Sequence, residues 1–221
     1  MTAKHEDTGT NISKLIFVPF LISLAITLLR LIGELQHWPV ALFNPAAGGG
    51  GAVVGISWLV PIFGIYFAVK LVRSGNGPAS AGKAILFAIL GLLVFAAGGF
   101  ILGKFGASPV TLLGFLLFLA AAVIPAVGWK DLFKVLFAYA LSARIPVAIL
   151  MFFAIMGNWH THYDVAPPNF PEGVSTMTKF VEIGLLPQLT LWIGFTVALG
   201  ALFGSVVAAL LPREKKVPQP A

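Results

Sequence analysis

The chain has 221 residues, of which 58% are hydrophobic and 10% are charged, whereas soluble domains average about 45–50% apolar and about 25% charged residues. This composition, with a mean hydropathy of +0.96, excludes a soluble globular domain. The net charge of +6 comes from basic residues that flank apolar stretches, so it indicates membrane topology and no nucleic-acid partner. Because the chain has no cysteine, disulfides, thiolate metal sites and thiol nucleophiles are excluded.

Six apolar segments follow one another along the chain, each close to the ~20 residues that a helix needs to cross a bilayer. They are Lys14–Gly33, Ala52–Val72, Lys83–Leu102, Pro109–Gly128, Phe133–Met156 and Pro187–Leu210. The sequence therefore predicts an all-α, polytopic transmembrane helical bundle of six spans over residues 14–210. A tail of residues 1–13 precedes it and a basic tail of residues 211–221 follows it.

The distribution of Lys and Arg between the two sides of these spans predicts the orientation. One side carries Lys4, Lys14, Lys70, Arg73, Lys83, Lys130, Lys134, Arg213, Lys215 and Lys216, and the other carries Arg30, Lys104 and Lys179. This bias predicts a multi-pass protein of the cytoplasmic (inner) membrane with both termini in the cytoplasm.

The two long loops, 34–51 and 157–186, then face outward. In the second loop the spacing of apolar residues over Ser175–Leu185 predicts a short helix lying in the membrane interface. Four tryptophans are expected in an aromatic belt at the outer interface: Trp38, Trp58, Trp159 and Trp192.

Pairs of small residues at four-residue spacing recur within or beside the spans and predict close helix packing. They are Gly51/Gly55, Ala84/Ala88, Gly99/Gly103, Ala122/Ala126 and Gly200/Gly204. Such faces pack within one bundle or between chains, so the expected partners are membrane lipids, a second copy of the chain, or a larger membrane complex.

Arg144 is the most informative single residue, because it lies in the middle of the fifth predicted span. An arginine at the centre of a membrane helix costs about 2.5–3.5 kcal/mol, and none of the eight acidic residues lies within a span at that depth. One interpretation is structural: Pro146 leaves the carbonyl of Ser142 without its helical donor, and the guanidinium binds it. The other is functional: Arg144 binds an anionic substrate, a lipid headgroup or an acidic residue of a partner subunit.

A polar stripe runs along the first span, where Ser23, Thr27, Arg30, Glu34 and His37 recur at helical spacing. Arg30 and Glu34 are four residues apart and are expected to pair. The stripe either holds helices together by hydrogen bonds or, with Arg144, lines a cationic vestibule that opens outward.

The segment from Trp159 to Asp164 contains a His-x-His-x-Asp pattern. If it is extended, His160, His162 and Asp164 share one side and form a candidate site for a divalent metal ion, with His37 as a fourth ligand. A metal-bound water would then make hydrolysis possible. The alternative is a loop that caps a helix end.

The stretch Gly128–Pro146 resembles bacterial multi-pass proteins of the Yip type in Phe137-Ala138-Tyr139-Ala140 and the later Pro146. No function is transferred from it, and phosphate-loop, dinucleotide-binding and hydrolase motifs are absent from the sequence. We therefore expect a non-enzymatic accessory subunit or a small permease-like bundle that uses Arg144, with Arg30, Glu34, Thr27 and Ser23, for an anionic ligand or partner. The alternative is a metal-dependent membrane enzyme that uses the His-x-His-x-Asp loop.

Overall fold

The computed structural model describes residues 11–105, 110–168 and 170–212, and within these ranges every regular element is a helix. The predicted N-terminal tail up to residue 10, the predicted span start at Pro109 and the basic residues from Arg213 onward lie outside the described residues.

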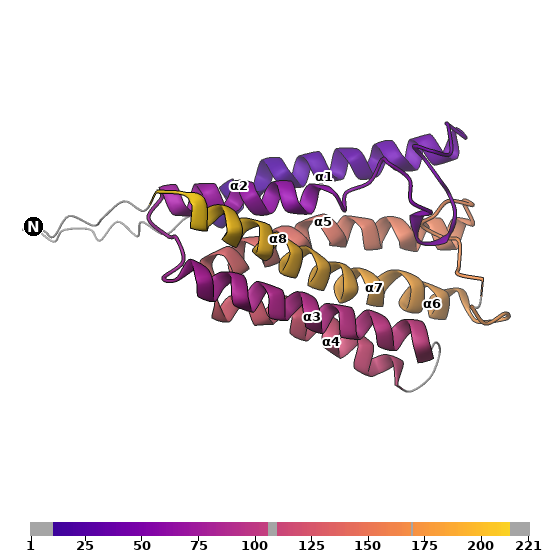
Figure 1. Cartoon of the computed structure of the whole chain (residues 1–221). Coiled ribbons are helices and arrows are strands. Elements are labelled where there is room, and N and C mark those ends of the chain that lie inside the picture. Colours follow the sequence, from indigo (N-terminus) through magenta and orange to yellow (C-terminus); the bar gives the residue numbers. More distant parts are fainter. Residues whose placement is uncertain (1–10, 106–109, 169, 213–221) are drawn as a thin grey trace, which may run out of the picture.

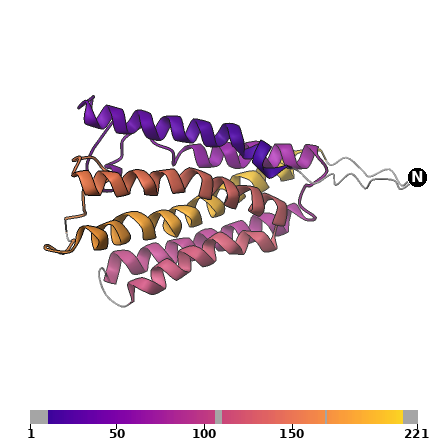
Figure 2. The same ribbon diagram turned by 180° about the vertical axis from the view of Figure 1, so that it is seen from behind.

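The helices run side by side along one axis, and the two longest loops lie at the same end of the bundle (Figures 1 and 2). We call this end, with residues 36–58, 158–168 and 170–175, the loop end. The start of α1 and the end of α8 lie together at the opposite end (Figure 1). The elements are α1 (Ile12–Leu35), η1 (Ala47–Gly49), α2 (Leu59–Arg73), α3 (Ala81–Phe105), α4 (Thr111–Val123), η2 (Ile124–Val127), α5 (Lys130–Gly157), α6 (Thr176–Lys179), η3 (Phe180–Leu185), α7 (Leu186–Leu189) and α8 (Leu191–Leu210).

Four helical segments of the described chain are long and apolar enough to cross a membrane: Ile12–Leu35, Ala81–Phe105, Lys130–Gly157 and Thr176–Leu210. The other two predicted spans are shorter, because α2 has 15 residues and the helical stretch of α4 and η2 is Thr111–Val127. At 1.5 Å per residue, α2 is about 22 Å long, less than the ~30 Å of a hydrocarbon core. Residues 52–58 of the second predicted span are not helical, and the Val54 carbonyl among them accepts a hydrogen bond from Arg30 of α1.

The helix predicted to lie in the membrane interface over Ser175–Leu185 is instead the first part of the last long helical segment. α6, η3, α7 and α8 follow one another along one direction (Figure 1). The Phe180 ring packs edge-on against Phe152 of α5, 5.2 Å between centroids, which holds this part against the bundle. The segment contains a π-helical turn at η3 and a local break at Thr190 (φ −121°, ψ −72°).

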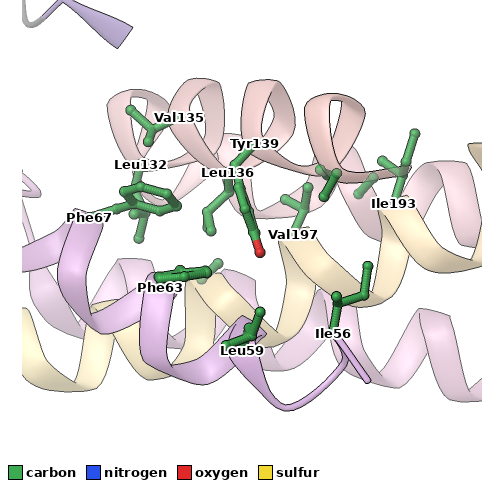
Figure 3. Close-up of a cluster of buried hydrophobic side chains, with 14 of the residues drawn as sticks. Ile56, Leu59, Phe63, Phe67, Leu132, Val135, Leu136, Tyr139, Ile193 and Val197 are labelled. Carbon is green, nitrogen blue, oxygen red and sulfur yellow. The ribbon is translucent and has the colours of Figure 1, made fainter. Parts of the chain in front are cut away.

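The core lies where α2, α5 and α8 meet. Figure 3 shows Phe63 and Phe67 of α2 facing Leu136 and Tyr139 of α5, with Val197 of α8 beside them. Tyr139 packs edge-on against Phe63 and Phe67, with centroids 5.3 and 5.5 Å apart. Such close contacts stabilise the bundle by van der Waals attraction, since lipid provides no hydrophobic driving force between helices.

Glycines let α2 and α8 approach closely. A Cβ on Gly64 would collide with the backbone carbonyl oxygen of Gly200, and a Cβ on Gly204 would lie 2.8 Å from the carbonyl oxygen of Gly64. The predicted Gly200/Gly204 face therefore packs within the chain. By contrast, a Cβ added to Gly99 or Gly103 of α3 would meet no atom of the described residues within 4 Å.

Candidate functional site

A cavity of about 400 Å³ lies between the helices near the loop end, within the range of small-molecule sites. Its exposed rim includes Gly48, Pro167 and Glu182. Its deep part includes Arg144 of α5 and Trp192 of α8. The cavity thus connects the loop end with the middle of α5.

Arg144 is only 4% exposed and is one of the residues that line this cavity. Its guanidinium carbon lies 4.5 Å from the centre of the Trp192 ring, which is close enough for a cation–π interaction. The ion pairs found in the described residues do not include Arg144, and its buried Nε has no hydrogen-bond partner there. The structure does not show the predicted contact with the Ser142 carbonyl, because Arg144 donates no hydrogen bond to it within the same ranges, and α5 continues as one helix through Pro146.

Gln188 of α7 provides a second incompletely satisfied polar group in the cavity wall. The side chain is 6% exposed, and its Nε2 donates a 3.5 Å hydrogen bond to the sulfur of Met151 on α5. Its Oε1 is buried and has no hydrogen-bond donor among the described residues. A buried acceptor without a donor costs about 1–3 kcal/mol, so this oxygen lowers the stability of the folded chain.

The polar stripe of α1 forms a buried face of the helix as far as Glu34. Ser23 shares a 2.7 Å hydrogen bond with the hydroxyl of Tyr139 on α5, and it also donates to the Pro19 carbonyl. Thr27 donates to the Ser23 carbonyl and lines the cavity. Ser23 therefore joins two helices, whereas Thr27 contributes to the cavity wall.

Arg30 and Glu34 form the predicted ion pair, with Nε 2.8 Å from Oε1 and both side chains almost fully buried. The two terminal nitrogens of Arg30 donate to the carbonyls of Asn44, Gly49 and Val54. Gly49 has a φ of +85°, and a Cβ there would come within 2.9 Å of the guanidinium. Arg30 is therefore neutralised by Glu34 and holds the loop after α1 in place.

His162 binds the same carboxylate from the other loop. Its Nδ1 lies 2.6 Å from Oε1 of Glu34, and its backbone N–H donates to Oε2 at 2.8 Å. Burial lowers the pKa of His162 below its usual value, while the contact with Glu34 acts in the opposite direction. A neutral His162 has to carry its proton on Nδ1 to donate to the carboxylate.

Tyr163 lies next to the same contact and is buried. Burial raises the pKa of its phenol above the usual value, which keeps the hydroxyl protonated, and this hydroxyl donates to the Thr27 carbonyl at 3.1 Å.

The predicted metal ligands are not gathered into one site. Among the described residues, no three or more His, Cys, Asp or Glu side chains are placed to hold a metal ion. The segment is a turn rather than an extended strand, because the backbone N–H of Asp164 bonds to the Thr161 carbonyl and His160 has a φ of +57°. The Asp164 carboxylate accepts hydrogen bonds from the backbone N–H groups of His160 and Thr161 and from the Thr161 hydroxyl. Exposed His37 lies beyond the end of α1, also with positive φ.

Comparisons with models of known protein families, with curated protein sequences and with solved structures find no match to this chain. The cavity brings together Arg144, Arg30 and Thr27 of the predicted ligand-binding residues, and His162 of the predicted metal ligands also lines it.

Two residues that the sequence does not single out as ligands complete the deep part of the cavity. Trp192 is predicted for the aromatic belt at the outer interface, and the structure also places the Arg144 guanidinium over its ring. The sequence does contain a feature that could have pointed to Gln188. It is a polar residue near the start of the last predicted span, one helical turn before Trp192.

Proposed function

We propose that this chain is a six-helix, multi-pass protein of the cytoplasmic membrane, with both termini in the cytoplasm, that binds an anionic ligand at Arg144 in a cavity open to the outer side. The observation that carries this proposal is the buried guanidinium without an acidic partner among the described residues, in the wall of a cavity of ligand size. An unpaired buried charge is costly, and ionisable groups at this depth commonly mark ligand pathways. A bound anion would supply the missing negative charge.

The surroundings of Arg144 support a small ligand more than a contact with a neighbouring protein. The residue is 4% exposed and is reached through the cavity, so an acidic side chain packed beside the bundle would not touch it. Arg30 is already neutralised by Glu34. Permease-like handling of an anionic solute is therefore the function that the geometry supports best.

A second candidate is an accessory subunit of a larger membrane complex or a homo-oligomer. It is favoured by α3, which has few buried residues and in which Gly99 and Gly103 meet no described neighbour. Small residues on an open helix face allow another helix to approach closely.

Native mass spectrometry of the protein extracted with surrounding lipid tests these functions. The comparison is between the wild type, Arg144→Leu and the matched control Lys134→Gln, which removes a positive charge from an exposed position on the same helix. We expect a retained small anion or anionic lipid in the wild type and control, and its loss from Arg144→Leu. Loss of a protein chain instead supports the accessory subunit, and identical bound species in all three overturn a binding role for Arg144.

A further inference from the structure

The position of the cavity beside the short helix α2 points to the kind of anion that it takes. We infer that the ligand is an anionic membrane lipid, whose headgroup enters sideways from the bilayer to Arg144 while its acyl chain lies along the apolar wall. This inference rests on the proposed function, because it assumes that Arg144 binds an anion in this cavity. It adds what the anion is and by which route it enters.

The cavity lies where α2 is missing from the wall of the bundle. α2 covers the space between α1 and α8 only in the half away from the loop end, and the chain before it crosses the other half without forming a helix (Figure 1). α5 closes this space from the opposite side (Figure 2). Three residues of the non-helical segment line the cavity: Gly55, Ile56 and Ser57. A single non-helical segment thus covers the cavity where a longer α2 would close it, which leaves an opening in the side of the bundle.

This side opening lies at membrane depth. The cavity is lined by Leu102 of α3, Phe115 of α4 and Leu191 of α8, all of them partly exposed. Leu102 and Leu191 belong to two of the segments that are long and apolar enough to cross a membrane. Thr27 lines the cavity from α1, which is another such segment. The molecules beside the opening are therefore membrane lipids.

The charges along the two routes favour the side opening for an anion. The rim at the loop end carries the exposed carboxylate of Glu182, which has no ion-pair partner among the described residues. This charge repels an anion that arrives from water. The residues that line the cavity near the side opening are uncharged apart from Arg30, which Glu34 neutralises. An anion therefore meets no uncompensated negative charge on the sideways route.

The terminal nitrogens of Arg144 are the groups that bind the headgroup. Nη1 and Nη2 have no hydrogen-bond partner among the described residues, and unlike Nε they are not fully buried. Arginine N–H groups bind phosphate oxygens by charge-assisted hydrogen bonds. Arg144 is the one lining arginine without an acidic partner in the described part of the chain. The single negative charge of a lipid phosphodiester therefore balances it.

Apolar side chains in the cavity wall favour a ligand with an acyl chain. The wall includes Ile56, Leu102, Phe115, Val147 and Leu191. An acyl chain along these residues would remove their apolar surface from water, which favours binding. A small hydrated anion would leave the same surface uncovered.

The full chain in lipid nanodiscs tests the inference with two photoreactive lipids, phosphatidylglycerol and phosphatidylcholine, each with a diazirine near the start of one acyl chain. Buried Val147 lines the cavity, so a lipid labels it only from inside. We expect phosphatidylglycerol to label Val147 about tenfold more than phosphatidylcholine, because its net negative charge is attracted to Arg144. Leu93 of α3, which is 61% exposed and does not line the cavity, should be labelled equally by both lipids. Mass spectrometry of the labelled peptides measures these ratios.

Two variants test the headgroup site and the route. In Arg144→Leu the labelling of Val147 by phosphatidylglycerol should fall to the level of phosphatidylcholine. Ser57→Trp, which places a large side chain at the side opening, should have the same effect, and Leu102→Trp replaces it if it does not fold. The matched control Val53→Trp adds the same side chain at an exposed position that does not line the cavity, and it should keep the labelling of the wild type. Equal labelling by the two lipids in the wild type, or undiminished labelling in Arg144→Leu or at the blocked opening, overturns the inference.

A water-soluble probe separates this inference from the proposed function. Glycerophosphoglycerol has the headgroup of phosphatidylglycerol without its acyl chains, and isothermal titration calorimetry measures its binding to the delipidated full chain. We expect it to bind at least about tenfold more weakly than the lipid, since it leaves the apolar wall uncovered. If it binds in an Arg144-dependent manner while the lipid does not label Val147, only the inferred ligand class is wrong. If Arg144→Leu retains the same species as the wild type in native mass spectrometry, the proposed function itself fails.

Discussion

Glu34 and His162 lie 128 residues apart in the sequence and are joined by two hydrogen bonds, one from the His162 backbone at 2.8 Å and one with its ring Nδ1 at 2.6 Å. The same carboxylate pairs with Arg30, which binds three carbonyls of the other long loop. One buried acid at the end of α1 therefore connects the two long loops to each other, directly through His162 and indirectly through Arg30.

The titration of His162 predicts how stability depends on pH. Burial, with the nearby charge of Arg30, lowers the pKa of His162, whereas Glu34 and Asp164 act to raise it, and the net direction is downward. The unfolded state thus binds a proton more readily than the folded state. The contribution of neutral His162 to the free energy of unfolding is present above the pKa of a histidine in the unfolded chain, about 6.5. It is lost as pH falls below that value.

Thermal unfolding between pH 5 and pH 8 measures this effect. We expect the melting temperature of the wild type to fall below about pH 6.5, with a slope of at most about 1.4 kcal/mol per pH unit from this one proton. His162→Gln should show a smaller fall. A rise in wild-type stability on acidification would contradict the direction of the pKa.

Glu34→Gln should destabilise the protein strongly, because it removes the negative charge from a buried ion pair and leaves Arg30 uncompensated. The expected loss is about 3–5 kcal/mol in the free energy of unfolding. The matched control is Asp131→Asn, which breaks the exposed pair with Lys134 and should cost less than about 1 kcal/mol. Chemical unfolding in detergent compares them, and similar losses for both would rule out Glu34 as the connection between the loops.

Gly64→Ala should disrupt the contact between α2 and α8, since the added methyl group meets the Gly200 backbone, which cannot move aside as a flexible side chain could. We expect a loss of about 1–3 kcal/mol, as for overpacking. Gly99→Ala is the control, because it adds the same methyl group to open space and should be neutral or stabilising by up to about 1 kcal/mol. Melting temperatures of the two variants decide the point.

The hydrogen bond between Ser23 and Tyr139 should contribute modestly to the packing of α1 on α5. A double-mutant cycle with Ser23→Ala and Tyr139→Phe is expected to give a coupling energy of about 0.6 kcal/mol, the average for polar contacts between membrane helices. The Ser23 hydroxyl keeps an alternative acceptor in the Pro19 carbonyl, which limits the loss in Tyr139→Phe. A coupling energy near zero would assign no stabilisation to this contact.

Single cysteines test the proposed orientation, since the natural chain has none. We expect a cysteine at exposed Val53, near the loop end, to react with a membrane-impermeant maleimide added to intact cells. A cysteine at exposed Ser74, at the opposite end of α2, should react only after the membrane is opened. The reverse pattern would place the termini outside.

The sequence by itself determined the helical class and much of the polar face of the first helix. Apolar runs near 20 residues predict membrane helices because unpaired backbone groups are too costly in lipid. The four-residue spacing from Arg30 to Glu34 predicts their ion pair, since such residues face each other on a helix. The mid-span position of Arg144 similarly singles it out before any contact is known.

Only the tertiary structure decided which groups meet across the chain. The sequence predicts His162 beside His160 and Asp164, but a turn replaces the extended segment, and a carboxylate 128 residues away binds its ring. Likewise, the contact of Arg30 with the loop before α2 and the contact of Phe152 with Phe180 in the last helical segment join residues that are far apart in the sequence. Local spacing cannot show such contacts, because they are set by the packing of distant segments, and the unpaired atoms of Arg144 and Gln188 were revealed only by that packing.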